Sequence, residues 1–202
     1  MTRRLDVVIV NGSPTERSKT MGLAGLVTTS LGNKLDIRTS SVDVYRLGSG
    51  FTGAITREDV TSDVEEGLRR VETADVLIAA APVFRATYPG MFKHLFDLVD
   101  QYALANKPVI LVATGGSDRH ALMIEHALRP LFGFFQAATA PVGFYANSGD
   151  FDGTLVLNNE VYSRIEIGIG DILPQLRTLA DAAAPDSSPA AAAPIPGFSA
   201  KR

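Results

Sequence analysis

The chain of 202 residues contains no cysteine, and its only histidines are His94, His120 and His126. Without cysteine it can form no disulfide, present no thiolate nucleophile and bind no metal through sulfur. The three histidines do not have the spacing of a zinc site. These absences exclude disulfide-stapled folds, thiol catalysis and cysteine-ligated metal centres.

Excess charge and long hydrophobic runs are also lacking. The 19 basic and 22 acidic side chains give a formal net charge of -3, which argues against nucleic acid as the main partner. No apolar run is long enough to cross a bilayer, and the first residues lack the apolar region of a signal peptide. We therefore expect a cytoplasmic enzyme or binding protein with neither nucleic acid nor membrane as a partner.

What is present is a regular alternation of strand-like and helix-like segments, which suits a single domain over residues 1–182. Several strand-like runs are apolar almost throughout, as in strands buried on both faces. The alternation predicts an α/β fold, a flavodoxin-like doubly wound five-stranded parallel sheet with strand order 2-1-3-4-5. The expected strands are Leu5–Val10, Ile37–Leu47, Val76–Ala80, Val109–Val112 and Ala138–Tyr145, and the expected helices are Met21–Leu31, Asp59–Glu72, Pro89–Ala105, Arg119–Phe132 and Asn158–Ala182.

Two segments depart from this alternation. Residues 183–202 hold four prolines among alanines and serines and cannot bury enough apolar surface to fold alone. We expect this Pro/Ala-rich segment to be a disordered tail. The loop Gly48–Thr56 is expected to be a surface excursion that carries Phe51.

Three polar loops follow strands whose carboxyl ends meet at one edge of such a sheet, where ligands bind. The first, Gly12–Thr20, carries Ser13, Arg17, Ser18 and Thr20, which suit a phosphate held at the N-terminus of the following helix. An ordinary N-cap at Ser18 or Thr20 would explain the same hydroxyls. The loop is neither a Walker loop nor a dinucleotide G-x-G-x-x-G, which argues against NTPases and ordinary Rossmann dehydrogenases.

The second loop, Pro82–Tyr88, carries an aromatic, a basic and a hydroxyl side chain, which suits a flat, partly polar ligand. Its candidate binding residues are Pro82, Val83, Phe84 and Arg85. Alternatively, Phe84 packs into the core and Arg85 is simply solvated.

The third loop, Thr114–His120, has two adjacent glycines at a strand end, so the backbone can approach a ligand and its N–H groups are free to donate. Its candidate binding residues are Thr114, Gly115, Gly116 and Ser117. A plain strand-to-helix turn capped by Ser117 or Asp118 is the alternative. A fourth segment, Asn147–Gly153, is expected near the same edge.

Together these loops resemble those of the NAD(P)H-dependent FMN reductase family of flavodoxin-like proteins. In that family the pattern G-S-x-x-x-x-S-x-T surrounds the FMN phosphate, and Gly12, Ser13, Ser18 and Thr20 match it here. The stretch Ala113–Phe132 resembles the branch that supplies reduced flavin to two-component monooxygenases. A second, longer family pattern is matched by Pro82, Phe84, Thr87, Pro89, Gly90, Phe92, Lys93 and Asp97.

Two positions depart from the family pattern. Many members have arginine where this chain has Thr15, and Arg17 is the candidate replacement. Some sulfonate-linked members have an inserted tyrosine that widens the helix after the third loop into a π-bulge, and His126 stands at the matching position. The resemblance predicts local widening at His126 without the aromatic hydroxyl, and a histidine at a subunit contact is the simpler alternative.

The resemblance implies an NAD(P)H:FMN oxidoreductase that supplies reduced FMN to a two-component monooxygenase. Its cofactors would be FMN and either NADPH or NADH, without a metal, and no catalytic side chain is expected because the cofactor performs the hydride transfer. The resemblance also implies a homodimer or homotetramer. The alternatives are an FMN-containing quinone or azo-compound reductase, a flavodoxin-type electron carrier and an anion- or nucleotide-binding module.

Overall fold

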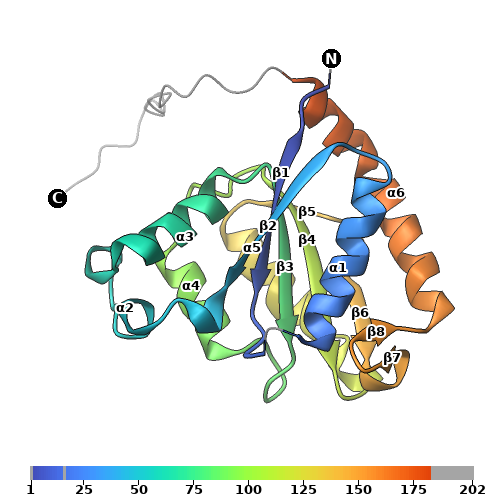
Figure 1. Cartoon of the computed structure of the whole chain (residues 1–202), viewed down its shortest axis with the longest axis horizontal. Helices are drawn as coiled ribbons and strands as arrows, with labels where there is room; N and C mark the ends of the chain where they lie inside the picture. Colours follow the sequence, from blue (N-terminus) through green and yellow to red (C-terminus); the bar gives the residue numbers. More distant parts are fainter. Residues whose placement is uncertain (1, 16, 183–202) are drawn as a thin grey trace.

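The computed structural model describes residues 2–15 and 17–182. The predicted tail, residues 183–202, lies outside these ranges. Figure 1 shows one twisted sheet between two helical layers, with α1 and α6 on one side and α2 to α5 on the other. The helices are α1 (Lys19–Gly32), α2 (Ser49–Thr52), α3 (Ser62–Thr73), α4 (Gly90–Leu98), α5 (Arg129–Phe134) and α6 (Asn159–Asp181).

The main sheet is parallel and has the order β2-β1-β3-β4-β5, with β6 also paired to β4. This confirms the predicted α/β fold and its 2-1-3-4-5 order. The strands are β1 (Leu5–Asn11), β2 (Ile37–Asp43), β3 (Val76–Pro82), β4 (Pro108–Gly115), β5 (Ala138–Thr139) and β6 (Phe144–Asn147). None of the helices within the described ranges has the length and apolar character needed to cross a membrane.

Three predicted elements are shorter or more divided than expected. The strand predicted to reach Leu47 ends at Asp43, where a 3₁₀ turn follows. The strand predicted over Ala138–Tyr145 is split into β5 and β6, because Pro141 has no N–H with which to continue the ladder. The helix predicted to reach Ala105 ends at Leu98 and gives way to turns. A small antiparallel hairpin, β7 (Phe151–Asp152) with β8 (Leu155–Val156), was not predicted.

The sheet separates two hydrophobic clusters. In β1, Val7 and Ile9 face the cluster beneath α1 and α6, whereas Val8 and Val10 face the cluster beneath α3, α4 and α5. Alternate side chains of a strand point to opposite faces, so an apolar run without polar interruptions is what a doubly covered strand requires. The same reasoning explains why β3 and β4 are buried almost throughout.

Phe51 anchors the excursion between β2 and α3 to the core. The predicted surface segment carries this ring inward, where it is fully buried, with its centroid 4.7 Å from that of His94. The Nε2 atom of His94 lies 2.9 Å from the carbonyl oxygen of Phe51. The aromatic side chain therefore holds the loop against α4 rather than extending into solvent.

Lys107 stabilises the edge of the sheet that lies opposite the three loops. It directly precedes β4, and its mostly buried ammonium donates hydrogen bonds to the carbonyl oxygens of Glu72 and Ala74 at the C-terminal end of α3. Burial lowers the pKa of Lys107 to about 8, and the nearby carboxylates of Asp75 and Glu72 only partly oppose that shift.

The free energy of unfolding is therefore expected to rise by about 1 to 2 kcal/mol between about pH 7 and pH 10. In this range the unfolded chain, whose lysine has its ordinary pKa of 10.5, binds more protons than the folded chain. Above that range the sign reverses, because burial raises the pKa of Tyr145 to about 12 and the phenol ionises first in the unfolded chain. Urea unfolding across this range measures the effect, and Lys107→Met should abolish the rise; an equal rise in that variant would contradict the assignment.

Candidate functional site

The carboxyl ends of β1, β3 and β4 meet at one edge of the sheet, at the bottom of Figure 1. The strand register pairs Asn11 with Ala80 and Pro82 with Thr114, so the three predicted loops begin side by side. The N–H of Val83 donates to the carbonyl oxygen of Thr114 at 2.7 Å, which joins the second and third loops directly. The structure thus brings the predicted site residues to one edge.

In the first loop, Ser18 is the N-cap of α1. Its Oγ accepts a hydrogen bond from the N–H of Met21 at 3.1 Å, as the capping alternative predicts. Capping satisfies only one of the unpaired N–H groups of the first turn, so the helix N-terminus retains donors and a partial positive charge for an anion. Arg17 next to it is exposed.

The hydroxyl of Thr20, which is predicted to suit the phosphate, is hydrogen-bonded within the protein. The residue is only 1% exposed, and its Oγ1 lies 2.6 Å from Oγ1 of Thr114. This buried bond links the first turn of α1 to the end of β4. Thr20 therefore fixes the first loop relative to the third, and its side chain does not extend to the surface.

Asn11 holds the start of the first loop, although the sequence pattern did not single it out. The side chain is buried, its Nδ2 donates to Oδ1 of Asp43 at 2.6 Å, and its Oδ1 accepts the N–H of Ser13 at 2.9 Å. The sequence feature that could have identified Asn11 is its position as the polar residue at the end of the apolar run of β1. Directly after it, a Cβ on Gly12 would lie 2.7 Å from the ring of Phe92, so the close packing of the backbone here favours glycine.

The second loop ends in a strained two-residue turn. Phe84 and Thr87 exchange hydrogen bonds of 2.7 and 3.2 Å, and the residues between them, Arg85 and Ala86, have φ values of 48° and 74°. Glycine and asparagine usually fill such a turn, and each other residue in it costs on the order of 1 kcal/mol. Phe84 is 43% exposed, so the alternative that it packs into the core is wrong, whereas Arg85 is exposed as the solvated alternative predicts.

The third loop is held by two aromatic side chains. The Tyr145 hydroxyl donates to the carbonyl oxygen of Ser117 at 2.5 Å, and the N–H of Gly116 donates to Nδ1 of His120 at 3.2 Å. The expectation that both glycine N–H groups are free is therefore wrong for Gly116. Gly115 packs so closely that a Cβ there would lie 2.5 Å from the Tyr145 hydroxyl oxygen.

The fourth segment closes the edge as expected. The ammonium of Lys19 donates to the carbonyl oxygen of Ser148 at 3.2 Å, which ties this segment to the first loop. The amide of Asn147 donates to Oδ1 of Asp118 at 2.6 Å, which ties it to the third. These two contacts place the fourth segment beside the first and third loops.

The helix after the third loop contains the predicted widening. Residues Ile124–Leu128 form a π-helical turn, in which the N–H of Arg129 donates to the carbonyl oxygen of Ile124. The π-turn and the 3₁₀ turn Asp118–His120 replace most of the predicted helix Arg119–Phe132, and α5 begins only at Arg129. His126 lies on the π-turn and is exposed.

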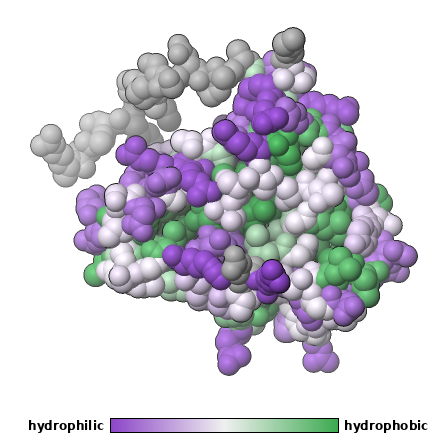
Figure 2. Space-filling model, viewed as in Figure 1, coloured by the Kyte–Doolittle hydropathy of each residue, from purple (hydrophilic) through white to green (hydrophobic). Residues whose placement is uncertain are grey.

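Unpaired positive charge gathers at this edge. Arg17, Arg85 and Arg119 are exposed and form no hydrogen bond or ion pair with any other residue that the structure describes. Most other arginines are engaged; Arg57, for example, bonds both Glu65 and Glu72. Figure 2 shows strongly hydrophilic side chains projecting from the lower edge of the molecule. This arrangement suits a ligand with phosphate groups.

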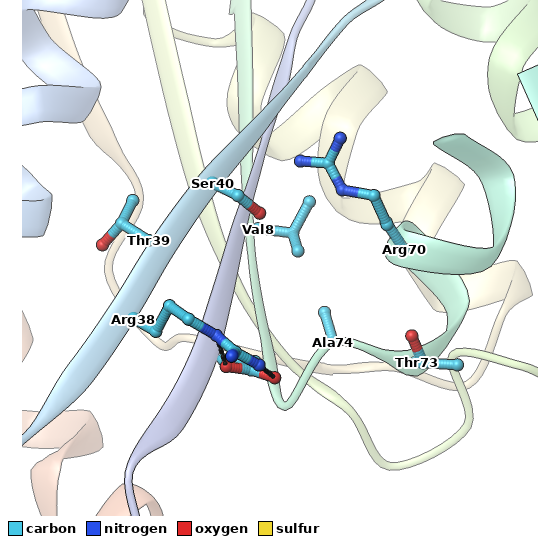
Figure 3. Close-up of a pocket in the computed structure, with 8 residues that line it drawn as sticks. Val8, Arg38, Thr39, Ser40, Arg70, Thr73 and Ala74 are labelled. Carbon is cyan, nitrogen blue, oxygen red and sulfur yellow. Dashed lines mark hydrogen bonds and ion pairs between the residues drawn. The ribbon is translucent and has the colours of Figure 1, made fainter. Parts of the chain in front are cut away.

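A cavity of about 360 Å³ lies elsewhere, between the amino-terminal half of β2 and the end of α3 (Figure 3). Arg38 and Arg70 line it, but both already have partners. Arg38 forms a bidentate ion pair with Asp6, and Arg70 donates to the carbonyl oxygen of Ser41. The cavity lies beside the amino-terminal half of β2 and not at the carboxyl ends of the strands, so it is separate from the candidate site.

The chain is similar to known proteins over most of its length. The model of the NADPH-dependent FMN reductase family matches residues 5–152, a range that includes all three loops. The chain is 41% identical over 167 residues to the NADH-dependent FMN reductase SfnF of Pseudomonas fluorescens (strain Pf0-1), covering 83% of this chain and 89% of that protein. It is 40% identical over 167 residues to FMN reductase (NADPH) of Pseudomonas aeruginosa, covering 83% and 90%. The solved apo structure of NADH:FMN oxidoreductase (EMOB) superposes with a TM-score of 0.73 at 25% identity, covering 92% of each chain.

Proposed function

This chain belongs to the NADPH-dependent FMN reductase family, and we propose that it transfers a hydride from NADPH or NADH to FMN at the edge formed by its three loops. The observation that supports this most is the meeting of a capped helix N-terminus, a strained aromatic turn and a glycine turn at one place. Relatives at 40% identity or more are themselves named FMN reductases, so the quinone-reductase and electron-carrier alternatives are not favoured.

The donors at this edge fit FMN. The N-terminus of α1 with Ser13, Ser18 and Arg17, whose guanidinium has no partner among the described residues, would hold the phosphate. The flavin ring would lie against the backbone of the second and third loops, including Gly115. The remaining residues proposed for that contact are Pro82, Val83, Phe84, Arg85, Thr114, Gly116 and Ser117.

When bound, FMN supplies the hydride acceptor, and the chain supplies position and electrostatics. Hydrogen bonds between Val83 and Thr114, and between Thr20 and Thr114, fix the loops relative to one another before any ligand arrives. Such preorganisation lowers the cost of bringing nicotinamide and flavin together. No acid or base is needed among the side chains, because the transferred group is not a proton.

The test of this proposal is NAD(P)H oxidation followed by absorbance while free FMN is varied. Saturable dependence on added FMN is expected. Oxidation that needs a quinone or azo acceptor and ignores added FMN would favour the alternative reductase, and no oxidation at all would favour a carrier.

Arg85 and Arg119 are the proposed contacts for the phosphates of the nicotinamide nucleotide. The variant Arg85→Ala/Arg119→Ala is expected to raise KM for NADPH about tenfold, and KM for NADH less, because NADPH carries one more phosphate. The matched control is Arg177→Ala. Arg177 lies on α6 and, like Arg85 and Arg119, it is exposed and has no partner among the described residues. Unchanged KM values for both nucleotides in the double variant would remove these residues from the site.

A homodimer or homotetramer is supported by a few large apolar side chains. On the helical segments beside this surface, Leu95, Leu98, Met123 and Leu131 are core residues. Tyr102, Leu122 and Phe134, however, are 67%, 61% and 67% exposed. Sedimentation velocity at several concentrations tests assembly, and a species of monomer mass throughout would refute it.

We further assign a flavin-dependent monooxygenase as the recipient of reduced FMN. The support is the resemblance of Ala113–Phe132 to the branch that serves such enzymes, together with the π-turn found there. Dependence on NAD(P)H as the electron source favours the cytoplasm as its location. Replacing this reductase by chemically reduced FMN in a coupled oxygenation assay tests whether it is needed only as a flavin source.

A further inference from the structure

His120 closes the third loop onto itself. It ends the 3₁₀ turn Asp118–His120, and its own N–H donates to the carbonyl oxygen of Ser117 at 3.1 Å. Its ring then reaches back, so that Nδ1 accepts the N–H of Gly116 at 3.2 Å. Two hydrogen bonds from one residue therefore fix the backbone on both sides of the Gly116–Ser117 peptide.

The same ring packs against Gly115. A Cβ added at Gly115 would lie 2.8 Å from Cβ of His120, 2.9 Å from its Nδ1 and 2.5 Å from the hydroxyl oxygen of Tyr145. Both aromatic side chains thus contact Gly115, and each makes a hydrogen bond with a later residue of the loop. The loop shape depends on these two side chains more than on regular secondary structure.

The bond from Gly116 requires the neutral imidazole. An N–H can be accepted only by a ring nitrogen with a lone pair, and a second proton on the ring would occupy Nδ1. Histidine is the side chain that commonly gains this proton between about pH 8 and pH 5.

None of the described carboxylates forms a hydrogen bond or ion pair with the ring of His120. Asp118 is engaged by the amide of Asn147, and Arg119 is cationic. Tyr145 stays neutral because burial raises its pKa, and the carboxylates of Asp118 and Asp150 raise it further. Asp150 itself accepts hydrogen bonds from Asn147 and Asn158.

We infer that His120 is a positioning residue, whose neutral ring holds Gly115–Ser117 in the shape that receives the flavin, and whose protonation releases that shape and weakens FMN binding. This inference rests on the proposed function. It assigns His120 no contact with the reacting atoms.

The experiment compares FMN affinity, measured by flavin fluorescence quenching, at about pH 8 and about pH 5.5 in three proteins. Asparagine in His120→Asn can place its amide oxygen near the position of Nδ1, so it accepts the same N–H but does not titrate. Leucine in His120→Leu fills similar space without an acceptor. Thermal unfolding of each variant checks that it folds.

At about pH 8 we expect His120→Asn to bind FMN nearly as tightly as the natural chain and His120→Leu to bind about five- to tenfold more weakly. On acidification the natural chain should lose about five- to tenfold more affinity than His120→Asn. The FMN phosphate also gains a proton in this range, but that change is common to both proteins. If His120→Leu does not fold, the inference is tested by comparing the pH dependence of FMN affinity in the natural chain with that in His120→Asn.

Two results would overturn the inference while the proposed function stands: His120→Leu with natural affinity at about pH 8, or His120→Asn with the same pH dependence as the natural chain. A natural chain that fails to bind FMN at that pH would instead overturn the proposed function, and this inference with it.

Discussion

Ser18→Asp is expected to raise the Kd for FMN about 100-fold without destabilising the protein. Aspartate caps a helix as well as serine does, and its charge is favourable at the positive end of the helix dipole. The extended backbone of Ser18, with φ of -135° and ψ of 158°, accepts aspartate without strain. Stability should therefore be equal to or slightly above that of the natural chain.

Binding should respond in the opposite sense. A phosphate monoester carries a charge between about -1.5 and -2 at neutral pH. A carboxylate placed about 5 Å from it, at an effective dielectric constant near 20, costs on the order of 3 kcal/mol per unit charge before salt screening. This cost appears only if the phosphate really sits at the N-terminus of α1.

The matched control is Ser18→Asn, which retains a neutral capping oxygen. Isothermal titration with FMN and urea unfolding should be run on both variants. A large loss of affinity in Ser18→Asp with a much smaller one in Ser18→Asn supports the phosphate site. Equal affinities in the two variants would place the phosphate elsewhere and reduce Ser18 to a helix cap.

The sequence was sufficient for the parts of the fold and site that depend on local pattern. The apolar runs of β1, β3 and β4 predicted buried parallel strands, and their order predicted which loops share an edge. The N-cap was narrowed to Ser18 or Thr20 because capping is a local motif, and the structure shows that it is Ser18. The widened turn at His126 was anticipated only through family resemblance, since no local rule places a π-turn.

What the sequence could not supply were contacts between distant residues. Thr20 and Thr114 are 94 positions apart, so nothing local showed that their hydroxyls meet. The engagement of Gly116 by His120 also went unpredicted, because a turn of four residues can close in several ways. Side-chain direction depends on packing that the pattern of polar and apolar residues does not determine.

Asn11 gives the second large effect, because its one buried side chain joins the first loop to the end of β2. Asn11→Asp is expected to lower the free energy of unfolding by about 3 kcal/mol at neutral pH. The amide that donates to Asp43 would become a second carboxylate 2.6 Å from the first, with no proton between them. The acceptor for the N–H of Ser13 would remain, so the loss reports the Asn11–Asp43 contact and not the loop turn.

Acid should partly rescue this variant. Two adjacent carboxylates raise the pKa of the pair, so that one proton is taken up on moderate acidification and restores an O–H donor. The deficit relative to the natural chain should therefore shrink between about pH 7 and pH 4.5. Urea unfolding at both pH values measures it.

The exchange variant Asn11→Asp/Asp43→Asn shows whether the loss of stability comes from repulsion between two carboxylates or from the loss of the contact itself. In it the carboxylate at position 11 can accept both the N–H of Ser13 and the amide of the new asparagine, so every partner is satisfied again. Most of the lost stability should return, together with FMN affinity, because the first loop is again held at the end of β1. If the exchange variant is as unstable as Asn11→Asp alone, the contact between β1 and β2 is not what fixes the first loop, and the shape of the phosphate site must come from α1.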